Sequence, residues 1–161
     1  MFTSWQPYQI FEPTYGSFSF LSTVLVAGSN IPTPIPHTIT EIAQNTSLIQ
    51  PLPSTKIQVN ETGIYKFSYS IQLSKTGGQS ATCDIWIRVN GVDVPRSSGQ
   101  VVVSGNQGET FPYCEFILQL NTHDYVEVYF RSPNVSMRAL YISTIGIPVV
   151  PSIITNIVRI A

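Results

Sequence analysis

Charged side chains are scarce in this sequence. They make up 11% of the 161 residues, against roughly 25% in an average soluble domain. So few charges give little repulsion between copies, which favours association. Two interpretations fit the deficit. Either part of the surface is buried against other subunits, because interface cores are depleted in charge, or the surface is neutral and rich in Ser, Thr, Asn and Gln. We favour the first.

Clusters of basic residues and long apolar runs are also missing. The eight Lys and Arg residues are scattered singly and the net charge is −1, which argues against binding to the phosphates of a nucleic acid. No apolar run approaches the roughly 18 residues of a membrane span. The first residues lack the pattern of a secretory signal. We therefore expect a protein made inside a cell, with neither nucleic acid nor membrane as a partner.

Side chains for catalysis or metal binding are few and isolated. His37 and His123 lie far apart and have no second ligand at metal spacing. Cys83 and Cys114 fall among the apolar positions of their segments, so we expect two buried thiols that pack as small hydrophobic groups. The alternative, a disulfide, requires facing Cβ atoms and an oxidising compartment. We expect no enzyme, no cofactor and no metal site.

What the sequence does contain is alternation of apolar and polar residues. Residues 65–73 and 83–89 place an apolar side chain at every second position, and Gly77-Gly78 separates the two runs. This period of two predicts antiparallel strands with one buried and one solvated face. About ten strands are expected in all, without a helical stretch: 16–26, 37–42, 55–59, 63–75, 81–90, 99–105, 110–120, 123–131, 135–145 and 152–160. Short strands at this spacing predict a sandwich or a barrel.

The same alternation assigns side chains to faces. It places the aliphatic residues of segments 81–90 and 123–131 inside, together with Phe116, Leu118, Leu120, Phe130 and both cysteines, and it places Tyr113, Glu115, Ile117 and Gln119 of segment 110–120 outside. It places Trp86, Tyr125 and Tyr129 on the outer side of their strands. Three large aromatic residues on strands that could be neighbours indicate a contact patch. We therefore expect Trp86, Tyr125 and Tyr129 to anchor an interface between copies.

The first 13 residues differ from the rest. They carry Phe2, Trp5, Tyr8 and Phe11 between prolines and lack steady alternation. We expect an extended N-terminal arm over 1–13, followed by a single β domain over 14–161. The four aromatic residues pack either on their own domain or on a neighbour. Our hypothesis is that they attach the protein to a larger particle.

Three segments carry a resemblance to a known family. The segment GIYKFSYSIQLSKTGGQSATCDIWIRVNGVDVPRSS, the later LNTHDYVEVYF and the final PSIITNIVRIA resemble the complement and tumour-necrosis-factor (TNF) jelly roll. The first is most similar to proteins of this fold in phage and large DNA virus particles. The resemblance covers about residues 14–161.

The resemblance implies a two-sheet antiparallel jelly-roll sandwich that assembles as a compact homotrimer. It also implies that the first strand, the last strand and strands 81–90 and 123–131 share the sheet that lines the threefold axis, which would place Trp86, Tyr125 and Tyr129 there. The expected function is a virion structural protein made in the host cytoplasm. It would decorate or cement a capsid, or form a minor capsid, tail or fibre component with other particle proteins. The alternative is a host-recognition module that binds a glycan or receptor through loops 76–80, 105–110 and 132–134.

Overall fold

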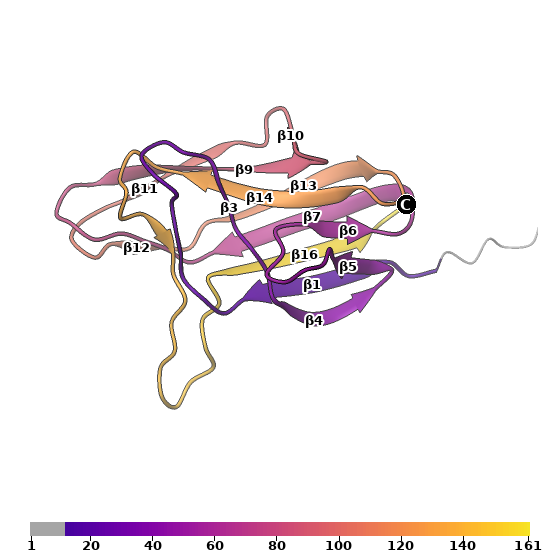
Figure 1. The fold of residues 1–161 in the computed structure, drawn as a ribbon, viewed down its shortest axis with the longest axis horizontal. Helices are drawn as coiled ribbons and strands as arrows, with labels where there is room; N and C mark the ends of the chain where they lie inside the picture. The colour runs from indigo at the N-terminus through magenta and orange to yellow at the C-terminus, as the bar shows by residue number, and fades with distance from the viewer. Residues whose placement is uncertain (1–11) are drawn as a thin grey trace, which may run out of the picture.

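The computed structural model describes residues 12–161, and all regular structure in this range is β-strand (Figure 1). A five-stranded antiparallel sheet has the order β13-β7-β16-β1-β4. A seven-stranded sheet has the order β10-β9-β14-β6-β5, with β11 paired to β9 and β3 paired to β14. A small third sheet has the order β12-β8-β15-β2. Between residues 12 and 161 there is no helix with the length and hydropathy to cross a bilayer.

The strand bounds are as follows. The five-stranded sheet is built from β1 (Tyr15–Phe20), β4 (Ile39–Gln44), β7 (Gly63–Ile71), β13 (Tyr113–Leu120) and β16 (Ile153–Arg159). The seven-stranded sheet is built from β3 (Thr33–Pro34), β5 (Thr46–Leu48), β6 (Ile57–Val59), β9 (Ala81–Val89), β10 (Val92–Asp93), β11 (Gly99–Val103) and β14 (Tyr125–Arg131). The small sheet contains β2 (Val24–Leu25), β8 (Leu73–Ser74), β12 (Glu109–Thr110) and β15 (Arg138–Ala139).

The core lies between the two large sheets, where the alternating apolar side chains meet. Phe67 of β7 and Ile157 of β16 come from one sheet, and Ile87 of β9 and Val128 of β14 come from the other. All four are fully buried. Burial of an aliphatic or aromatic side chain stabilises the fold by about 1.5–3 kcal/mol each. The predicted inward positions of β9, β13 and β14 are confirmed, with Cys114 and Phe116 half-buried at the sandwich margin.

Four predicted strands differ from the observed ones. Segments 16–26, 63–75 and 110–120 each divide into two strands. Segment 135–145 forms only the two-residue strand β15, because its start is a turn: the side chain of Asn134 accepts a hydrogen bond from the Ser136 amide, and the Met137 amide donates to the Asn134 carbonyl. After β15 the chain continues as a projecting loop to residue 151 (Figure 1).

The arrangement of the strands corrects one expectation. Strands β9 and β14 do not share a sheet with the first and last strands. Instead β1 and β16 pair with each other, and β16 also pairs with β7. β9 and β14 pair with each other in the opposite sheet. The sheet composition implied by the family resemblance was therefore wrong, although the inner and outer faces of these strands were assigned correctly.

Candidate functional site

The structure brings together two of the three predicted interface aromatics. Trp86 of β9 and Tyr129 of β14 are directly opposite in the strand register, and their rings stack with centroids 5.7 Å apart at an interplanar angle of 28°. Tyr125 lies four residues earlier on β14, where its half-buried ring contacts the ammonium of Lys56 at 4.7 Å. All three side chains lie on the outer side of the seven-stranded sheet.

Trp86 is nevertheless covered by polar neighbours within the same subunit, so that only 9% of it is exposed. Its indole Nε1 donates to Asp93 Oδ1 at 2.7 Å, and Arg88 Nε donates to the same oxygen at 2.6 Å. The Arg88 guanidinium also lies 4.0 Å from the Tyr129 ring centroid. The hydrogen bonds from Arg88 and Trp86 lower the pKa of the Asp93 carboxyl, and the bond to Asp93 raises the pKa of Arg88.

This coverage limits what Trp86 could add to an interface, since little of its surface remains to be buried. The role of Trp86, Tyr125 and Tyr129 as interface anchors stays a prediction. The predicted arm residues Phe2, Trp5, Tyr8 and Phe11 lie outside the described residues.

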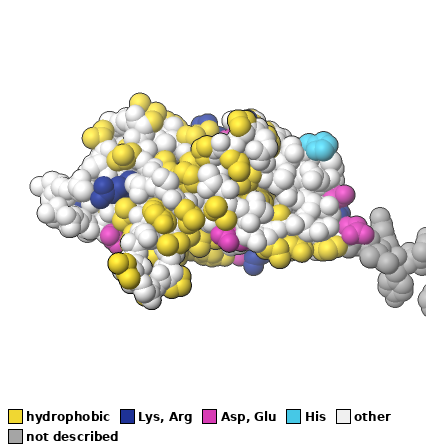
Figure 2. Space-filling view, turned by 60° about the horizontal axis from the view of Figure 1, so that its bottom comes forward, with side chains coloured by type: hydrophobic (Ala, Val, Ile, Leu, Met, Phe, Trp, Pro, Cys, Tyr) yellow, Lys and Arg dark blue, Asp and Glu magenta, His cyan; other side chains and the backbone are white. Residues whose placement is uncertain are grey.

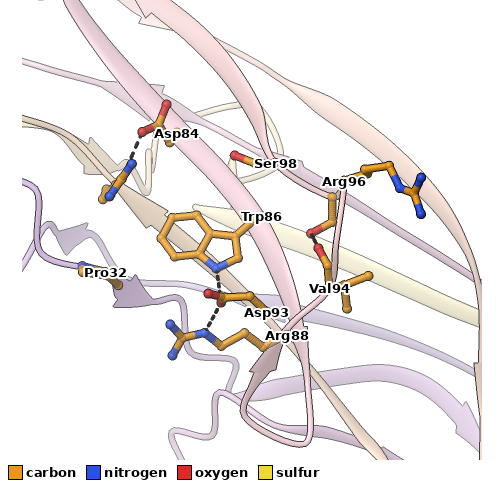
Figure 3. Close-up of a pocket in the computed structure, with 10 residues that line it drawn as sticks. Pro32, Asp84, Trp86, Arg88, Asp93, Val94, Arg96 and Ser98 are labelled. Carbon is orange, nitrogen blue, oxygen red and sulfur yellow. Dashed lines mark hydrogen bonds and ion pairs between the residues drawn. The ribbon is translucent and has the colours of Figure 1, made fainter.

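Beside Trp86 is a cavity of about 270 Å³ (Figure 3). Its lining is Pro32, Asp84, Trp86, Arg88, Asp93, Arg131 and residues 94 and 96–98. Asp84 accepts hydrogen bonds from Arg131 Nε at 3.0 Å and from Gln100 Nε2 at 2.8 Å. The turn at 94–98 is fastened to β9 because the Ser97 hydroxyl donates to the Val94 carbonyl and accepts from the Ile87 amide.

A second surface, which the sequence did not single out, is the outer face of the five-stranded sheet. Tyr113 and Ile117 of β13 are each 61% exposed there. Ile42 of β4 and Val158 of β16 are also exposed on this face, and small polar side chains lie between them: Ser17, Ser68, Ser70 and Asn156. Alternation had placed Tyr113 and Ile117 outside, and an outward isoleucine beside an outward tyrosine was the signal for this surface.

Charge on this second surface is balanced. Lys66 of β7 forms an ion pair with Glu115 of β13, with 3.0 Å between Nζ and Oε2. The Tyr113 hydroxyl donates to the same carboxylate oxygen at 2.9 Å. The hydrogen bonds from Lys66 and Tyr113 lower the pKa of Glu115, and the bond to Glu115 raises the pKa of Lys66. The face is therefore neutral over β13 and β7. Figure 2 shows one side of the molecule, on which groups of hydrophobic side chains lie among polar ones and charged side chains are few.

The loops predicted for host recognition are held together at one end of the sandwich. The buried Lys75 donates from Nζ to the carbonyls of Gly77 and Gly105. The Ser136 hydroxyl donates to the Thr76 carbonyl and accepts from its amide. The predicted loops 76–80 and 105–110 (observed as 104–108, before β12) are therefore connected, together with the turn at 134–136 that follows the predicted loop 132–134.

The remaining candidates for chemistry are separate from these surfaces. His37 is fully buried, with its Nε2 3.1 Å from the Thr155 hydroxyl, whereas His123 is exposed in a turn. Cys83 is buried and Cys114 is half-buried, and both are free thiols, so the disulfide alternative is absent. Across residues 12–161, three or more His, Cys, Asp or Glu side chains do not gather into a group that could hold a metal ion.

Comparison with known proteins identifies the fold. No protein-family model and no curated protein sequence matches the chain. Among solved structures, a crystal structure of murine APRIL at pH 8.0 matches with a TM-score of 0.58 and 12% identity, covering 92% of this chain and all of that one. A structure of Eiger TNF from S. frugiperda matches with a TM-score of 0.60 and 12% identity, covering 92% of this chain and 93% of that one.

The fold is a TNF-like jelly roll. A second murine APRIL structure, at pH 8.5, matches this jelly roll with a TM-score of 0.57 and 10% identity, over 92% of this chain and all of that one. The antiparallel sheets and the absence of helix from residues 12–161 agree with it. The predicted fold class, an all-β jelly-roll sandwich, is thus confirmed. At this level of identity, the likeness establishes the architecture of the jelly roll and no activity.

Proposed function

We propose that this TNF-like jelly roll is a non-enzymatic structural protein that acts by assembly. It forms a homotrimer through the outer face of the five-stranded sheet and serves in a virus particle as a decoration, cement, minor capsid or fibre component. The observation that carries the assembly proposal is the exposed part of that face around Tyr113 and Ile117, where the Lys66–Glu115 pair leaves no net charge. Exposed apolar patches of this kind mark interaction sites.

The composition of this face supports close packing between copies. Tyr113, Ile117 and Val158 provide apolar area, and tyrosine is enriched in interface cores. The short side chains of Ser68 and Ser70 allow a partner to approach the sheet closely. The Lys66–Glu115 pair adds no net charge. A specific interface needs about 800 Å² per partner, which is within reach of a five-stranded sheet face.

The particle proposal draws on a different source. The resemblance of residues 63–98 to virion jelly rolls supports it, together with the scarcity of charge, which suits a subunit with several buried contacts. The arm over 1–13, with Phe2, Trp5, Tyr8 and Phe11, is the proposed attachment to other particle proteins. Deletion of 1–13 should abolish incorporation into particles while the mass of the purified oligomer is kept. Unchanged incorporation would refute the arm's role.

The assembly proposal is tested by light scattering on the purified protein and two matched variants. A mass near three times the 17.8 kDa of the chain is expected. Ile117→Asp should give monomers, because a charge would be stranded in a desolvated contact. It should still fold, since Ile117 is exposed and lies opposite Lys66 in the register.

The control, Val102→Asp, places the same charge at a comparably exposed position on β11 in the other sheet. It should remain trimeric. The opposite pattern, with a Val102→Asp monomer and an Ile117→Asp trimer, would move the interface to the sheet of Trp86, Tyr125 and Tyr129. A wild-type monomer at high concentration would end the assembly proposal.

The second candidate function is recognition of a host glycan or receptor. The observation that favours it is the joining of loops 76–80 and 104–108 by Lys75, because binding loops function best on a rigid support. A glycan array and a host-cell binding assay test it. Binding that is lost when residues 76–80 are replaced by an unrelated loop of equal length is expected, and no binding in either assay would reject it.

A further inference from the structure

The cavity beside Trp86 is flanked by two ion pairs. Asp84 lies on one side of the indole, and Asp93 with Arg88 lies on the other (Figure 3). Of the two paired arginines, Arg131 is the more exposed: its side chain is 47% exposed, against 24% for Arg88, and it is bonded to Asp84 through Nε. Pro32 provides an apolar wall of the cavity.

This combination of groups matches the chemistry of a sugar. A sugar hydroxyl both donates and accepts hydrogen bonds, and the cavity offers carboxylate acceptors and guanidinium donors on both sides of an aromatic ring. The carbon-bound hydrogens of a sugar ring can pack against Pro32 and against the small part of Trp86 that is exposed, 9% of the residue. Ligand pockets usually enclose about 300–1,000 Å³, so a cavity of about 270 Å³ is suited to one sugar ring.

The charge of the lining favours an acidic sugar. Three arginines, Arg88, Arg96 and Arg131, stand against two aspartates, Asp84 and Asp93, which leaves a net charge of 3 − 2 = +1. Arg96 carries the surplus: it is exposed at the rim, in a left-handed backbone conformation with φ of 64°, and its guanidinium points away from Trp86 (Figure 3). Positive charge at a cleft attracts anionic ligands.

We propose that this cavity binds a single acidic sugar residue, with its ring against Pro32 beside the edge of Trp86 and its carboxylate or sulfate at Arg131. Arginine suits this role because its fork of N–H donors matches a carboxylate or sulfate. The positive charge of Arg96 at the rim attracts the anionic ligand toward the cavity. The cavity belongs to the seven-stranded sheet, so it stays open when copies associate through the five-stranded sheet. The inference therefore holds for monomer and trimer alike.

The experiment follows the Trp86 indole N–H by nuclear magnetic resonance, with its signal assigned through a Trp5→Phe variant. The full-length protein is titrated with N-acetylneuraminic acid, glucuronic acid, N-acetylglucosamine 6-sulfate, neutral N-acetylglucosamine and inorganic sulfate. At least one acidic sugar should shift the signal at millimolar concentrations. Arg131→Gln should weaken this binding by about tenfold or more, since hydrogen bonds to charged groups are strong.

Two variants complete the design. Arg96→Gln should weaken binding less than Arg131→Gln, and Lys66→Gln on the other sheet should have no effect. Thermal unfolding of each variant checks that the fold is retained, and Arg131→Lys should restore part of the affinity if charge is what the ligand needs. The proposal would be overturned if neutral N-acetylglucosamine or inorganic sulfate bound as tightly as the acidic sugars. It would also be overturned if none of the acidic sugars shifted the Trp86 signal at tens of millimolar. Loss of the trimer would leave it intact.

Discussion

Acid should destabilise this protein through one buried histidine. His37 is fully buried, and its backbone forms a two-way bridge with Ser54, with N–O distances of 2.7 and 2.9 Å. Its Nε2 lies 3.1 Å from the Thr155 hydroxyl of β16, and its Nδ1 has no hydrogen-bond partner. Burial lowers the pKa of His37 from 6.5 to about 4, and the Ser54 backbone opposes this with a smaller effect.

The sign of the pH dependence follows from proton binding. Between pH 6.5 and 4 the unfolded chain holds a proton on His37 that the folded chain lacks, so the free energy of unfolding falls as the pH falls through this window. Each pKa unit is equivalent to about 1.4 kcal/mol. The loss should reach about 2 kcal/mol at pH 4.5 and about 3 kcal/mol when complete.

The assay is urea unfolding at pH 7 and pH 4.5, at one fixed protein concentration because association adds to apparent stability. His37→Gln should remove most of the pH dependence, whereas His123→Gln should keep it, since His123 is exposed. The ion pair of Glu115 also weakens in acid, but its contribution is lost only as the pH falls from the unfolded-state pKa of 4.5 toward the lowered pKa of the folded state, so most of that loss lies below pH 4.5. The same slope in wild type and His37→Gln would refute the assignment.

Three further predictions concern groups in or near the core. Burial raises the pKa of the Cys83 thiol to about 12, so at pH 8 a thiol reagent should modify Cys114 readily and Cys83 only after unfolding; equal rates would contradict this. Lys75→Met should lower the free energy of unfolding by about 1–3 kcal/mol and speed amide exchange in loops 76–80 and 104–108, because the carbonyls of Gly77 and Gly105 lose their donor. Unchanged exchange would mean that Lys75 does not hold the two loops together. Gly108→Ala should lower the free energy of unfolding, measured with urea, by about 1–3 kcal/mol, because a Cβ there would collide with the Ser104 carbonyl. An unchanged free energy of unfolding would mean that the loop readjusts.

The sequence was sufficient to predict the fold class and the inward side of the main strands. Val126, Val128 and Phe130 are fully buried as expected, because a period of two depends only on the local chain. Alternation does not determine which strands become neighbours. Pairing depends on long-range packing, and for this reason the placement of β9 and β14 beside β1 and β16 was wrong.

The exposed fraction of Trp86 could not be predicted from alternation, for a related reason. The pattern correctly placed its ring outside the core, but residues that approach from other strands determine how much of an outward side chain is covered. Here Asp93, from β10, returns over the ring and accepts its N–H. The cavity lined by Asp84, Arg88 and Arg131 likewise combines residues from β9, β14 and the turn at 94–98, so no contiguous sequence motif could predict it.

Hydroxyl-radical footprinting of the native oligomer tests the central claim, assembly through the five-stranded sheet, most directly. The side chains of Tyr113 and Ile117 are 61% exposed in the single subunit. We predict that both are protected in the wild-type protein and become reactive in the Ile42→Asp variant, which carries its charge at the far side of the same face, while Val102 reacts equally in both. Tyr113 and Ile117 reacting at the level of Val102 in the wild-type protein would contradict the account.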